Sequence, residues 1–360
     1  MAARVVLAMS GGVDSSVAAH LLKQQGYDVI GLFMRTGVHA EDGVAAHKKG
    51  CCSAQDAGDA RRVADRLDIP FFALDFERDF ERIIDYFADE YVAGRTPNPC
   101  VVCNNWLKFG KLWSYGRQLG ADYVATGHYA RVLRRAGRVE LHRAADPAKD
   151  QSYVLFGLSR HLLTHLLFPI GGYAKQQIRE LARQAGLGVH DKPDSVEICF
   201  VPGGDHVELV RQRRPGLVTA GRIVDRAGQM LAEHDGIERF TIGQRKGLGF
   251  AAGDRRYVLE IIPGENEVVV GEREELLAAG LRASRVNWLI DEPPAGPLSC
   301  AVKIRYRHSP AAGTVHATAD GGALVTFVEP QPAVTPGQAV VFYDDSRVLG
   351  GGWIDSRFVN

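Results

Sequence analysis

The chain has 360 residues, of which 46% are hydrophobic, so it can hold two or three domains with buried cores. Lys plus Arg and Asp plus Glu each number 43, and a nucleic-acid partner would therefore need a local basic surface. No apolar run approaches membrane-spanning length and no signal peptide precedes the first strand, so we expect a cytoplasmic protein without a membrane partner. Six cysteines in such a chain indicate chemically active thiols rather than a disulfide framework.

The first predicted elements enclose a glycine-rich loop. Residues 5–8 form an apolar run typical of a buried strand, and residues 17–22 have the apolar spacing of a helix. A turn between a strand and a helix N-terminus binds phosphate, because free backbone N–H groups and the helix dipole face the anion. Gly11 and Gly12 allow close approach of the backbone, and Asp14 could cap the helix or help to hold magnesium. The loop reads Ala8-Met9-Ser10-Gly11-Gly12-Val13-Asp14-Ser15-Ser16.

This loop differs from the two commonest phosphate-binding motifs. It lacks the order G-x-x-x-x-G-K-[ST] of P-loop NTPases and the order G-x-G-x-x-G of dinucleotide-binding domains. An ordinary strand–helix turn with an Asp or Ser cap is the alternative, and the full string argues against it. Ser-Gly-Gly-Val-Asp-Ser-Ser resembles the PP-loop of the ATP pyrophosphatase superfamily, whose members bind the pyrophosphate of ATP and transfer AMP to a substrate oxygen.

Further strands and helices alternate along the first half of the chain, which predicts a Rossmann-like, doubly wound parallel sheet. Met34 ends the second strand, at the edge where ligands gather in such sheets. Strands are expected at 28–34, 71–74 and 122–126, a hairpin at 131–143, and helices at 54–67, 76–93, 159–167 and 174–185.

Beyond about residue 215 the sequence changes to short β runs separated by turn residues. We expect a PP-loop catalytic domain over 1–205, a small β-rich central domain over 215–275, and a C-terminal β-barrel over 281–360. In an expected strand over 299–307, one face carries Cys300, Val302, Ile304 and Tyr306, which places Cys300 in the core. The other face carries Lys303, Arg305 and Arg307, and is either a phosphate contact or a solvated exterior.

Two cysteines lie in the stretch Thr-Pro-Asn-Pro-Cys-Val-Val-Cys-Asn-Asn. Its prolines at positions 97 and 99 oppose helix, so we expect Cys100 and Cys103 on a constrained loop that enters a helix near Asn104. A thiolate at a helix N-terminus is stabilised and becomes more nucleophilic.

Spacing alone leaves three functions open for the thiols. Cys100 and Cys103 could form part of a zinc or iron–sulfur site with Cys51, Cys52 and Cys199. They could instead be a thioredoxin-like redox pair, although the neighbouring prolines fit that pattern poorly. The third possibility is that Cys103 acts with the distant Cys199, one thiol bearing sulfur and the other resolving it.

Six motifs in order resemble the bacterial tRNA-specific 2-thiouridylase (MnmA) family, and the likeness covers essentially the whole chain. They are Ser-Gly-Gly-Val-Asp-Ser-Ser, Thr-Pro-Asn-Pro-x3-Cys-Asn, Ala-Thr-Gly-His-Tyr-Ala, Lys-Asp-Gln-Ser-Tyr, Asp-Ser-x-Glu-Ile-Cys-Phe and Phe-Thr-Ile-Gly-Gln-Arg-Lys-Gly-Leu. The resemblance implies ATP-dependent 2-thiolation of the wobble uridine of tRNA, by adenylation of the C2 oxygen and sulfur transfer from a cysteine persulfide.

The resemblance also implies the catalytic residues and the nucleotide contacts. Cys199 matches the persulfide-carrying cysteine and Cys103 the second catalytic cysteine, which can end the cycle as a Cys103–Cys199 disulfide. Asp14 of the loop is the third expected catalytic residue, and Mg²⁺ is expected to enter with ATP rather than in a separate metal site. The implied ATP contacts are Ala8, Met9, Ser10, Gly11, Gly12, Val13, Asp14, Ser15, Met34 and Gly127.

The implied tRNA contacts fall into two groups. Asn98, Pro99 and Cys100 match the segment that touches the target base, which must leave the stack to expose C2. Cys100 is a departure, because other members carry a non-thiol residue there, and a redox or metal role for it stays open. Further contacts fall on His128, Lys149, Asp150, Gln151, Arg305, Tyr306 and Gln338.

The partners implied are tRNA and a sulfur donor, either a cysteine desulfurase or a relay carrier protein, and we expect a monomer. Cys51 and Cys52 are expected to be structural. Two other functions remain as alternatives: an amidating PP-loop ligase, and an RNA-binding protein stabilised by zinc or a cluster with a vestigial loop.

Overall fold

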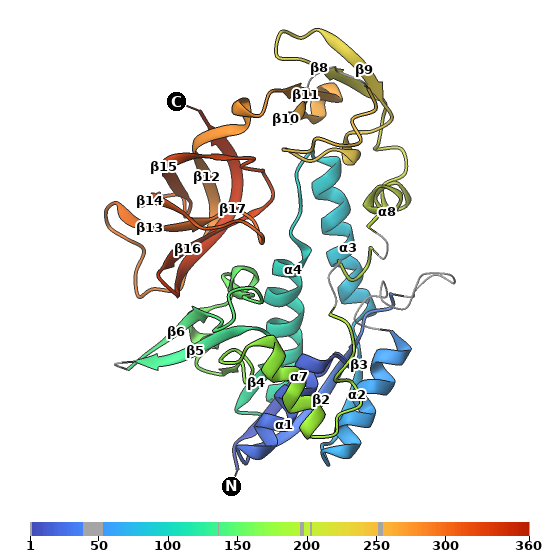
Figure 1. Cartoon of the computed structure of the whole chain (residues 1–360), viewed down its shortest axis with the longest axis vertical. Coiled ribbons are helices and arrows are strands. Elements are labelled where there is room, and N and C mark those ends of the chain that lie inside the picture. The colour runs from blue at the N-terminus through green and yellow to red at the C-terminus, as the bar shows by residue number, and fades with distance from the viewer. Residues whose placement is uncertain are drawn as a thin grey trace. The chain divides into compact units, whose positions relative to one another are not determined.

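The structure, a computed structural model, describes residues 2–38, 53–135, 137–194, 198–201, 204–250 and 255–359. It divides into two compact units, which are described separately below (Figure 1). The first unit comprises Met1–Ile83, Cys100–Gly204 and Ser346–Val348, and the second comprises Ile84–Pro99, Asp205–Asp345 and Leu349–Asn360. In the described part of the chain, no helix has the length and apolar character needed to cross a membrane.

The first unit is built on a five-stranded parallel sheet. Its strand order is β3-β2-β1-β4-β7, with neighbouring strands parallel throughout. This confirms the predicted doubly wound sheet, in which the first strand lies at the centre. The strands are β1 (Arg4–Ala8), β2 (Asp28–Arg35), β3 (Phe71–Asp75), β4 (Tyr123–Thr126) and β7 (Leu166–Leu167).

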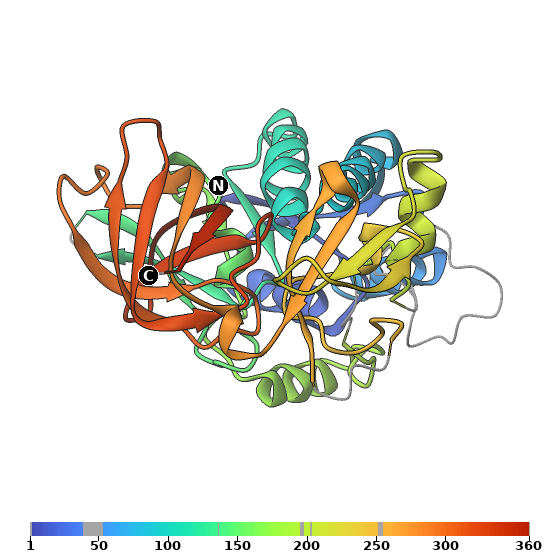
Figure 2. The same cartoon turned by 90° about the horizontal axis from the view of Figure 1, so that it is seen from above.

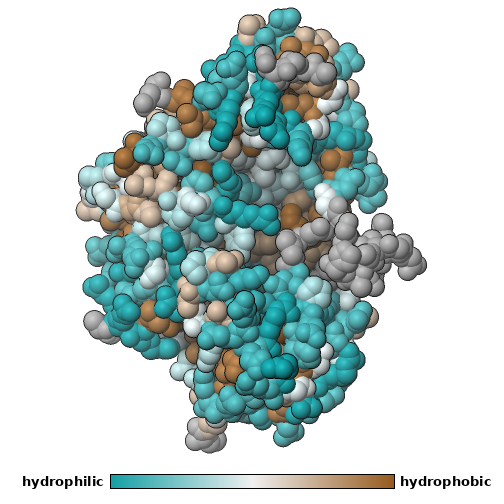
Figure 3. Space-filling view, viewed as in Figure 1, coloured by the Kyte–Doolittle hydropathy of each residue, from teal (hydrophilic) through white to brown (hydrophobic). Residues whose placement is uncertain are grey.

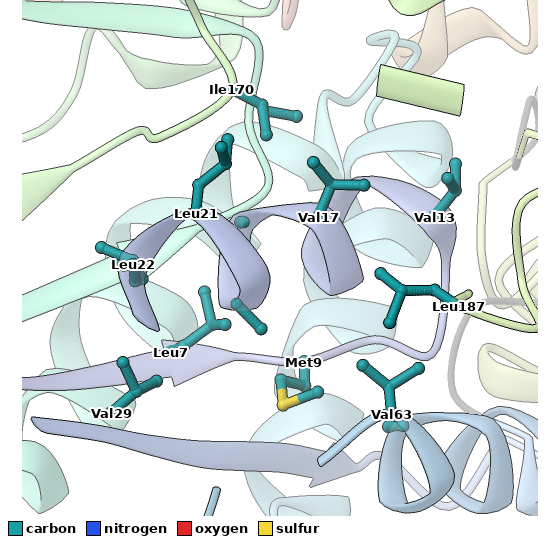
Figure 4. Packing of buried hydrophobic residues seen from close by; sticks show 14 of the residues in the cluster. Leu7, Met9, Val13, Val17, Leu21, Leu22, Val29, Val63, Ile170 and Leu187 are labelled. Carbon is teal, nitrogen blue, oxygen red and sulfur yellow. The ribbon is translucent and has the colours of Figure 1, made fainter. Parts of the chain in front are cut away.

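Helix α1 (Val13–Gln24) packs on this sheet and forms the centre of the core (Figure 4). Its Val17 and Leu21 pack in one cluster with Leu7 of β1 and Val63, and all four are buried. Burying a Val or Leu side chain contributes about 1.5–3 kcal/mol, so this cluster fixes the helix on the strand that precedes the glycine loop. The other helices of the unit are α2 (Ala54–Arg66), α5 (Trp113–Gln118), α6 (Arg160–Leu163) and α7 (Lys175–Gln184), and α3 (Glu77–Val92) runs from the first unit into the second.

One expected helix is shorter than predicted. The interpretation of residues 159–167 as a single helix was wrong, because α6 ends at Leu163 and residues 166–167 form strand β7. Ser159 caps the helix by accepting from the N–H of Leu162, and the Thr164 hydroxyl bonds back to a helix carbonyl. The Val124 N–H then donates to the His165 carbonyl, so the next residues gain sheet hydrogen bonds beside β4.

A second difference concerns the cysteine stretch. We expected a helix to begin near Asn104, but it begins at Pro99 with α4 (Pro99–Val102), continues as the π-helix η2 (Cys103–Leu112), and ends with α5. Proline suits the first helical position, since its missing N–H has no partner there and its φ is already helical. Pro99 therefore starts the helix rather than delaying it.

The predicted hairpin is confirmed as β5 (Ala130–Arg135) and β6 (Arg138–Arg143), paired antiparallel. The short 3-10 helix η3 (Ser152–Leu155) follows after a polar loop.

The second unit contains a four-stranded sheet of order β10-β11-β8-β9. Ile223, Phe240, Leu248 and Val258 form part of its core. Two of its strands, over 257–262 and 267–271, are paired antiparallel. The elements here are α8 (His206–Arg213), β8 (Gly221–Val224), β9 (Met230–His234), η4 (Ile237–Arg239), β10 (Tyr257–Ile262), η5 (Pro263–Glu265), β11 (Glu267–Gly271) and η6 (Glu274–Leu276).

The C-terminal strands of this unit form the predicted β-barrel (Figure 2). The order β12-β15-β14-β13-β16-β17 closes through pairing of β12 with β17, so these six strands leave no open edge between them. They are β12 (Leu277–Trp288), β13 (Leu298–Lys303), β14 (Ala311–Ala317), β15 (Ala323–Pro332), β16 (Ala339–Asp344) and β17 (Arg347–Phe358).

One barrel strand is shorter than predicted. Strand β13 ends at Lys303, so Tyr306 does not continue the face of Cys300, and it is 42% exposed. After Lys303 the chain turns, and the His308 N–H donates to the Arg305 carbonyl. Cys300 does pack against the barrel core as predicted, and burial raises the pKa of its thiol to about 12.

Candidate functional site

The glycine loop lies at the carboxyl end of β1, and its geometry depends on Gly11. This residue has φ +73°, and a Cβ there would overlap the backbone carbonyl oxygen of Asp56 at the start of α2. Glycine is therefore required for both the conformation and the space. Gly12 precedes α1 with extended backbone, so the first N–H groups of a twelve-residue helix face the loop. Such a terminus suits an anionic phosphate.

Serine side chains hold the loop from within. The Ser15 hydroxyl accepts from the Ser10 N–H at 3.2 Å and donates to the Gly12 carbonyl at 3.2 Å. The Ser16 hydroxyl donates to the same carbonyl at 2.8 Å. The possibility that Asp14 caps α1 was wrong, since no side chain caps the Gly12 position and Asp14 lies within the first turn.

Asp14 instead meets a lysine and a tyrosine. Its carboxylate oxygens both lie 2.8 Å from Nζ of Lys175, and one accepts from the Tyr129 hydroxyl at 2.7 Å. Burial, together with the Asp14 carboxylate, raises the pKa of Tyr129 well above its ordinary value. The Tyr129 hydroxyl therefore stays protonated at physiological pH and donates a hydrogen bond to Asp14. The Asp14 carboxylate is thus held from two sides.

Asp194 extends this arrangement to three cations. It pairs with Lys175 at 2.8 Å, Lys149 at 2.7 Å and Arg179 at 3.0 Å. Burial opposes ionisation of Asp194, but the hydrogen bonds from Lys149 and Lys175 outweigh it and lower its pKa. Three cations therefore surround the two carboxylates Asp14 and Asp194 beside the loop.

A second lysine reaches the loop from another direction. Nζ of Lys192 donates to the Gly11 carbonyl at 3.0 Å, to Asp56 at 2.5 Å and to Asp59 at 2.7 Å. Asp56 also accepts from the N–H of Ser53, with which it forms the capping box of α2. Burial would lower the pKa of Lys192, but the bonds to the two carboxylates outweigh it and raise that pKa.

Neither Lys175 nor Lys192 was among the predicted site residues. Both follow the loop by more than 150 positions, and nothing in their local sequence indicates which loop they reach. Only the charged stretch Asp191-Lys192-Pro193-Asp194, which supplies Lys192 and Asp194 to this network, indicated a charged site in the sequence.

The structure brings other predicted residues to the same place. A Cβ on Gly127 would lie 2.7 Å from the Ser15 nitrogen, so this glycine borders the first turn of α1. Gln151 accepts from the Tyr129 N–H through its side chain at 2.9 Å. Met34 lies near the carboxyl end of β2, which is paired with β1.

The two catalytic thiol candidates both belong to the first unit. Cys103 is half-buried and opens η2, whereas Cys100 in the preceding turn is exposed, and both carry their sulfur as thiols. Asn104 anchors this helix, because its buried side-chain nitrogen donates to the Val154 carbonyl of η3 at 3.0 Å. A π-helical turn of this kind is frequent at functional sites.

Cys199 is also a half-buried thiol and lies in a turn over residues 198–201. The Val201 N–H donates to the Ile198 carbonyl across this turn. Phe200 is buried edge-on against Phe80, with ring centroids 5.7 Å apart, and anchors the turn on α3. Cys51 and Cys52, expected to be structural, lie outside the described residues, and among the residues described there is no group of three His, Cys, Asp or Glu placed to hold a metal.

His128 is a buried, neutral histidine. Its Nδ1 lies 2.7 Å from the Thr126 hydroxyl, and its ring packs near Phe109 and Phe168. Burial, with a smaller effect of Lys108, holds its pKa well below 6.5. The ring is therefore neutral near pH 7 and does not supply a positive charge.

Asp150 has a structural position. Its buried carboxylate accepts from the Ala144 N–H and from both the N–H and the hydroxyl of Ser152. These bonds shape the loop that presents its neighbours Lys149 and Gln151.

In the second unit, Gln338 fastens the segment that leads to Asn98 and Pro99. Its side-chain nitrogen donates to the carbonyls of Thr96 at 3.1 Å and Pro97 at 3.0 Å. The Thr96 N–H also donates to the Pro336 carbonyl. Two other predicted tRNA contacts lie after β13, where the Arg305 guanidinium donates to the Pro332 carbonyl and Tyr306 is exposed.

Known protein families and relatives match this chain over nearly its whole length. Family models match residues 3–203 as a tRNA methyl transferase HUP domain, 212–272 as a tRNA methyl transferase PRC-barrel domain, and 278–354 as an aminomethyltransferase beta-barrel domain. A curated relative from Rhodopirellula baltica is 50% identical over 98% of this chain and 96% of its own length. Relatives from Geotalea uraniireducens and Clostridium perfringens are 51% and 48% identical, also over 98% of this chain, and cover 95% and 98% of their own lengths. All three are named tRNA-specific 2-thiouridylase MnmA.

A nucleotide-binding parallel α/β domain with a PRC barrel and a C-terminal β-barrel defines the class as a tRNA-modifying enzyme of the sulfurtransferase type. The chain belongs to the tRNA-specific 2-thiouridylase (MnmA) family.

Proposed function

We propose that this protein uses ATP to replace the C2 oxygen of the wobble uridine in tRNA by sulfur. The main support is identity of about half over 98% of the chain to relatives named for this activity. The same inference extends to a cytoplasmic location, to a sulfur-donor protein as a partner, and to a monomer. We also propose the three domains expected from the sequence, at 1–205, 215–275 and 281–360.

The glycine loop provides the first step. The N-terminus of α1 and the backbone of Gly11 and Gly12 would bind the β- and γ-phosphates, and Met34 and Gly127 would complete the nucleotide site. The C2 oxygen of the uridine attacks the α-phosphorus, pyrophosphate leaves, and the oxygen becomes part of a good leaving group, AMP. Positive charge from Lys175, Lys149 and Arg179 favours the pyrophosphate. Mg²⁺ would enter with the ATP phosphates and neutralise part of their charge.

Asp14 acts in this proposal through its partners. Its carboxylate is already held by Lys175 and Tyr129, so it fixes the lysine ammonium beside the first turn of α1. A lysine without that carboxylate would lose its orientation toward the loop.

The two thiols provide the second step. The terminal sulfur of a Cys199 persulfide attacks C2, and AMP leaves with the former C2 oxygen. The Cys103 thiolate then attacks Sγ of Cys199, which breaks the S–S bond, releases the sulfur on C2, and leaves a Cys103–Cys199 disulfide. A cellular thiol reductant supplies the two electrons that restore both thiols.

The remaining predicted contacts would hold the anticodon. Asn98, Pro99 and Cys100 would meet the extruded base and His128 would approach it as a neutral ring. Lys149, Asp150, Gln151, Arg305, Tyr306 and Gln338 complete the proposed set.

The deciding experiment incubates the protein with ATP, Mg²⁺, a persulfide donor and tRNA, and measures nucleosides by mass spectrometry. We expect 2-thiouridine with the wild type and none with Cys103→Ser or Cys199→Ser, while both variants still bind ATP. Cys100→Ser is the matched control and should retain product. Sulfur on a different base would refute the proposed reaction, and activity lost in Cys100→Ser but retained in Cys103→Ser would transfer the second thiol role to Cys100.

A further inference from the structure

The motif Phe-Thr-Ile-Gly-Gln-Arg-Lys-Gly-Leu, at residues 240–248, has no part in the steps above, yet it forms an elaborate loop of the second unit. Phe240 and Leu248, at its two ends, are buried in the core of the four-stranded sheet. Within it, the Gln244 side chain accepts from the Thr241 N–H at 3.0 Å and donates to the Lys246 carbonyl at 3.0 Å. The loop is therefore fixed at its base and braced across its tip.

Backbone pairing sets this loop beside the start of β10. The Gly243 N–H donates to the Val258 carbonyl at 2.8 Å, and the Val258 N–H donates to the Gln244 carbonyl at 2.9 Å. Arg245 and Lys246 directly follow the bonded residues Gly243 and Gln244, and Arg255 and Arg256 lie shortly before Val258. The two segments therefore bring their basic residues to the same edge.

Four cations share this edge: Arg245, Lys246 and Arg255 are exposed, and Arg256 is half-buried. Within the described residues, no ion pair engages any of them, whereas other arginines of the same sheet region do pair. Arg222 pairs with Glu267 at 3.1 Å, Arg226 with Glu275 at 3.0 Å, and Arg239 with Asp235 at 2.5 Å.

Neighbouring like charges repel, and a rigid loop prevents them from moving apart. Such an arrangement is stabilised when an anion spans the charges. We propose that this edge, formed by residues 244–247 and 255–256, binds the phosphate backbone of the tRNA, an inference that rests on the function proposed above. A run of nucleic-acid phosphates supplies several negative charges in a row, which matches several dispersed cations better than one small anion does.

A protein partner fits this edge less well. Protein interfaces have an apolar centre, but Leu248 is buried and the exposed positions 245–247 and 249 carry no apolar side chain. Figure 3 shows hydrophilic residues interspersed with hydrophobic ones over the four-stranded sheet, at the top of the view.

The test measures tRNA binding by the full-length protein as a function of salt. In Arg245→Ala/Lys246→Ala, we expect tRNA affinity to fall at least tenfold at 0.1 M salt. The plot of log K for tRNA binding against log salt concentration should become shallower, with its slope reduced in magnitude by about 1.5 to 2. The KM for ATP should not change, because neither residue belongs to the loop at β1. Arg222→Ala/Arg226→Ala removes two paired arginines of the same sheet and should leave the salt slope unchanged.

A second variant separates charge from shape. Gln244→Ala keeps every cation but removes the brace, so we expect a smaller loss of affinity, about threefold, with the salt slope retained. A melting temperature close to that of the wild type would show that each of these variants is folded.

The outcomes distinguish this inference from the proposed function. If the wild type thiolates tRNA while Arg245→Ala/Lys246→Ala binds tRNA with unchanged affinity and slope, the phosphate site is refuted and the function stands. If tRNA binding is unchanged but sulfur transfer from a donor protein is lost, and a small-molecule persulfide restores product, the edge binds a protein instead. If the wild type neither binds nor modifies tRNA, the proposed function itself fails.

Discussion

Nζ of Lys175 lies 2.8 Å from both carboxylate oxygens of Asp14, although 161 positions separate the two residues. The contact joins α7 to the first turn of α1, and only 11% of the lysine side chain is exposed. A half-buried carboxylate next to a phosphate site would repel the nucleotide. The lysine cancels that charge, and Asp194 holds the same ammonium from its other side.

Replacement of Lys175 tests this arrangement. We expect Lys175→Met to lower kcat/KM for ATP about 10- to 100-fold, since a charge-assisted hydrogen bond contributes about 1.5–3 kcal/mol. Lys175→Arg should retain part of the activity. Pyrophosphate release at saturating tRNA measures the effect. Lys23→Met is the control, because this lysine of α1 is exposed and donates to the Asp68 carbonyl. Equal activity in Lys175→Met and Lys23→Met would contradict the assignment.

The close approach at Gly11 gives a second prediction. Gly11→Ala should abolish ATP binding and lower the melting temperature, because its Cβ would overlap the Asp56 carbonyl and because φ is +73°. Gly26→Ala is a matched control, since its φ is +82° but nothing lies within 4 Å of an added Cβ. The control should lose only about 1–2 kcal/mol of stability, the cost of an alanine in the left-handed region, and should still bind ATP. Equal losses in both variants would show that conformation alone matters.

Local patterns in the sequence were sufficient to predict the sheet. The apolar run before Ala8 and the glycine loop that follows it are consecutive in the chain, so strand, turn and helix could be placed correctly. The same holds for the barrel strand with Cys300 and Val302 on its inner face, because alternation reports the face directly. At strand β7, where the structure differed, a longer-range contact decided. The pairing of His165 with Val124 converts the end of an expected helix into β7.

The charge network around the loop shows what sequence could not provide. Lys175 and Lys192 approach the loop from elements that follow it by more than 150 residues, and neither has a motif that specifies its partner. Their contacts depend on which helix covers which strand, and strand order could not be derived from the sequence. Resemblance, by contrast, supplied Cys103 and Cys199, for which spacing alone left three functions open.

Gln338 provides a test of positioning rather than of chemistry. Gln338→Ala removes two hydrogen bonds to the Thr96 and Pro97 carbonyls, each contributing about 0.5–1.5 kcal/mol. The segment leading to Asn98 should then be less well placed, and we expect KM for tRNA to rise about tenfold with KM for ATP unchanged. Steady-state thiolation kinetics measure both values. Gln212→Ala, which removes an exposed side chain of α8, should change neither, and an unaltered KM for tRNA in Gln338→Ala would refute the positioning role.

Thiol reactivity should separate Cys300 from the catalytic candidates. Burial raises the pKa of Cys300 to about 12, so about one molecule in 10⁴ carries the thiolate at pH 8. We expect Cys300→Ala to leave the fast phase of labelling by Ellman's reagent unchanged in the folded protein. Cys103→Ser and Cys199→Ser should each remove one fast-reacting thiol. A smaller fast phase in Cys300→Ala would show that this thiol is accessible.

The buried His128 predicts a pH dependence of stability. Burial, with a smaller effect of Lys108, holds its pKa well below 6.5 in the folded chain, whereas the unfolded chain titrates near 6.5. Below pH 6.5 the unfolded state therefore binds a proton that the folded state does not, and stability falls as pH falls. Above about pH 7.5 both states are neutral at this residue and its effect vanishes.

The measurement is urea unfolding of the wild type and His128→Asn between pH 7.5 and 5.5. The free energy of unfolding of the wild type should decrease by about 1.4 kcal/mol more than that of the variant over this range. Comparison of the two proteins cancels the contributions of His234 and His308, whose pKa values burial also lowers. A constant difference between wild type and His128→Asn would mean that the pKa of His128 is the same in the folded and unfolded chains, and would contradict the lowered pKa.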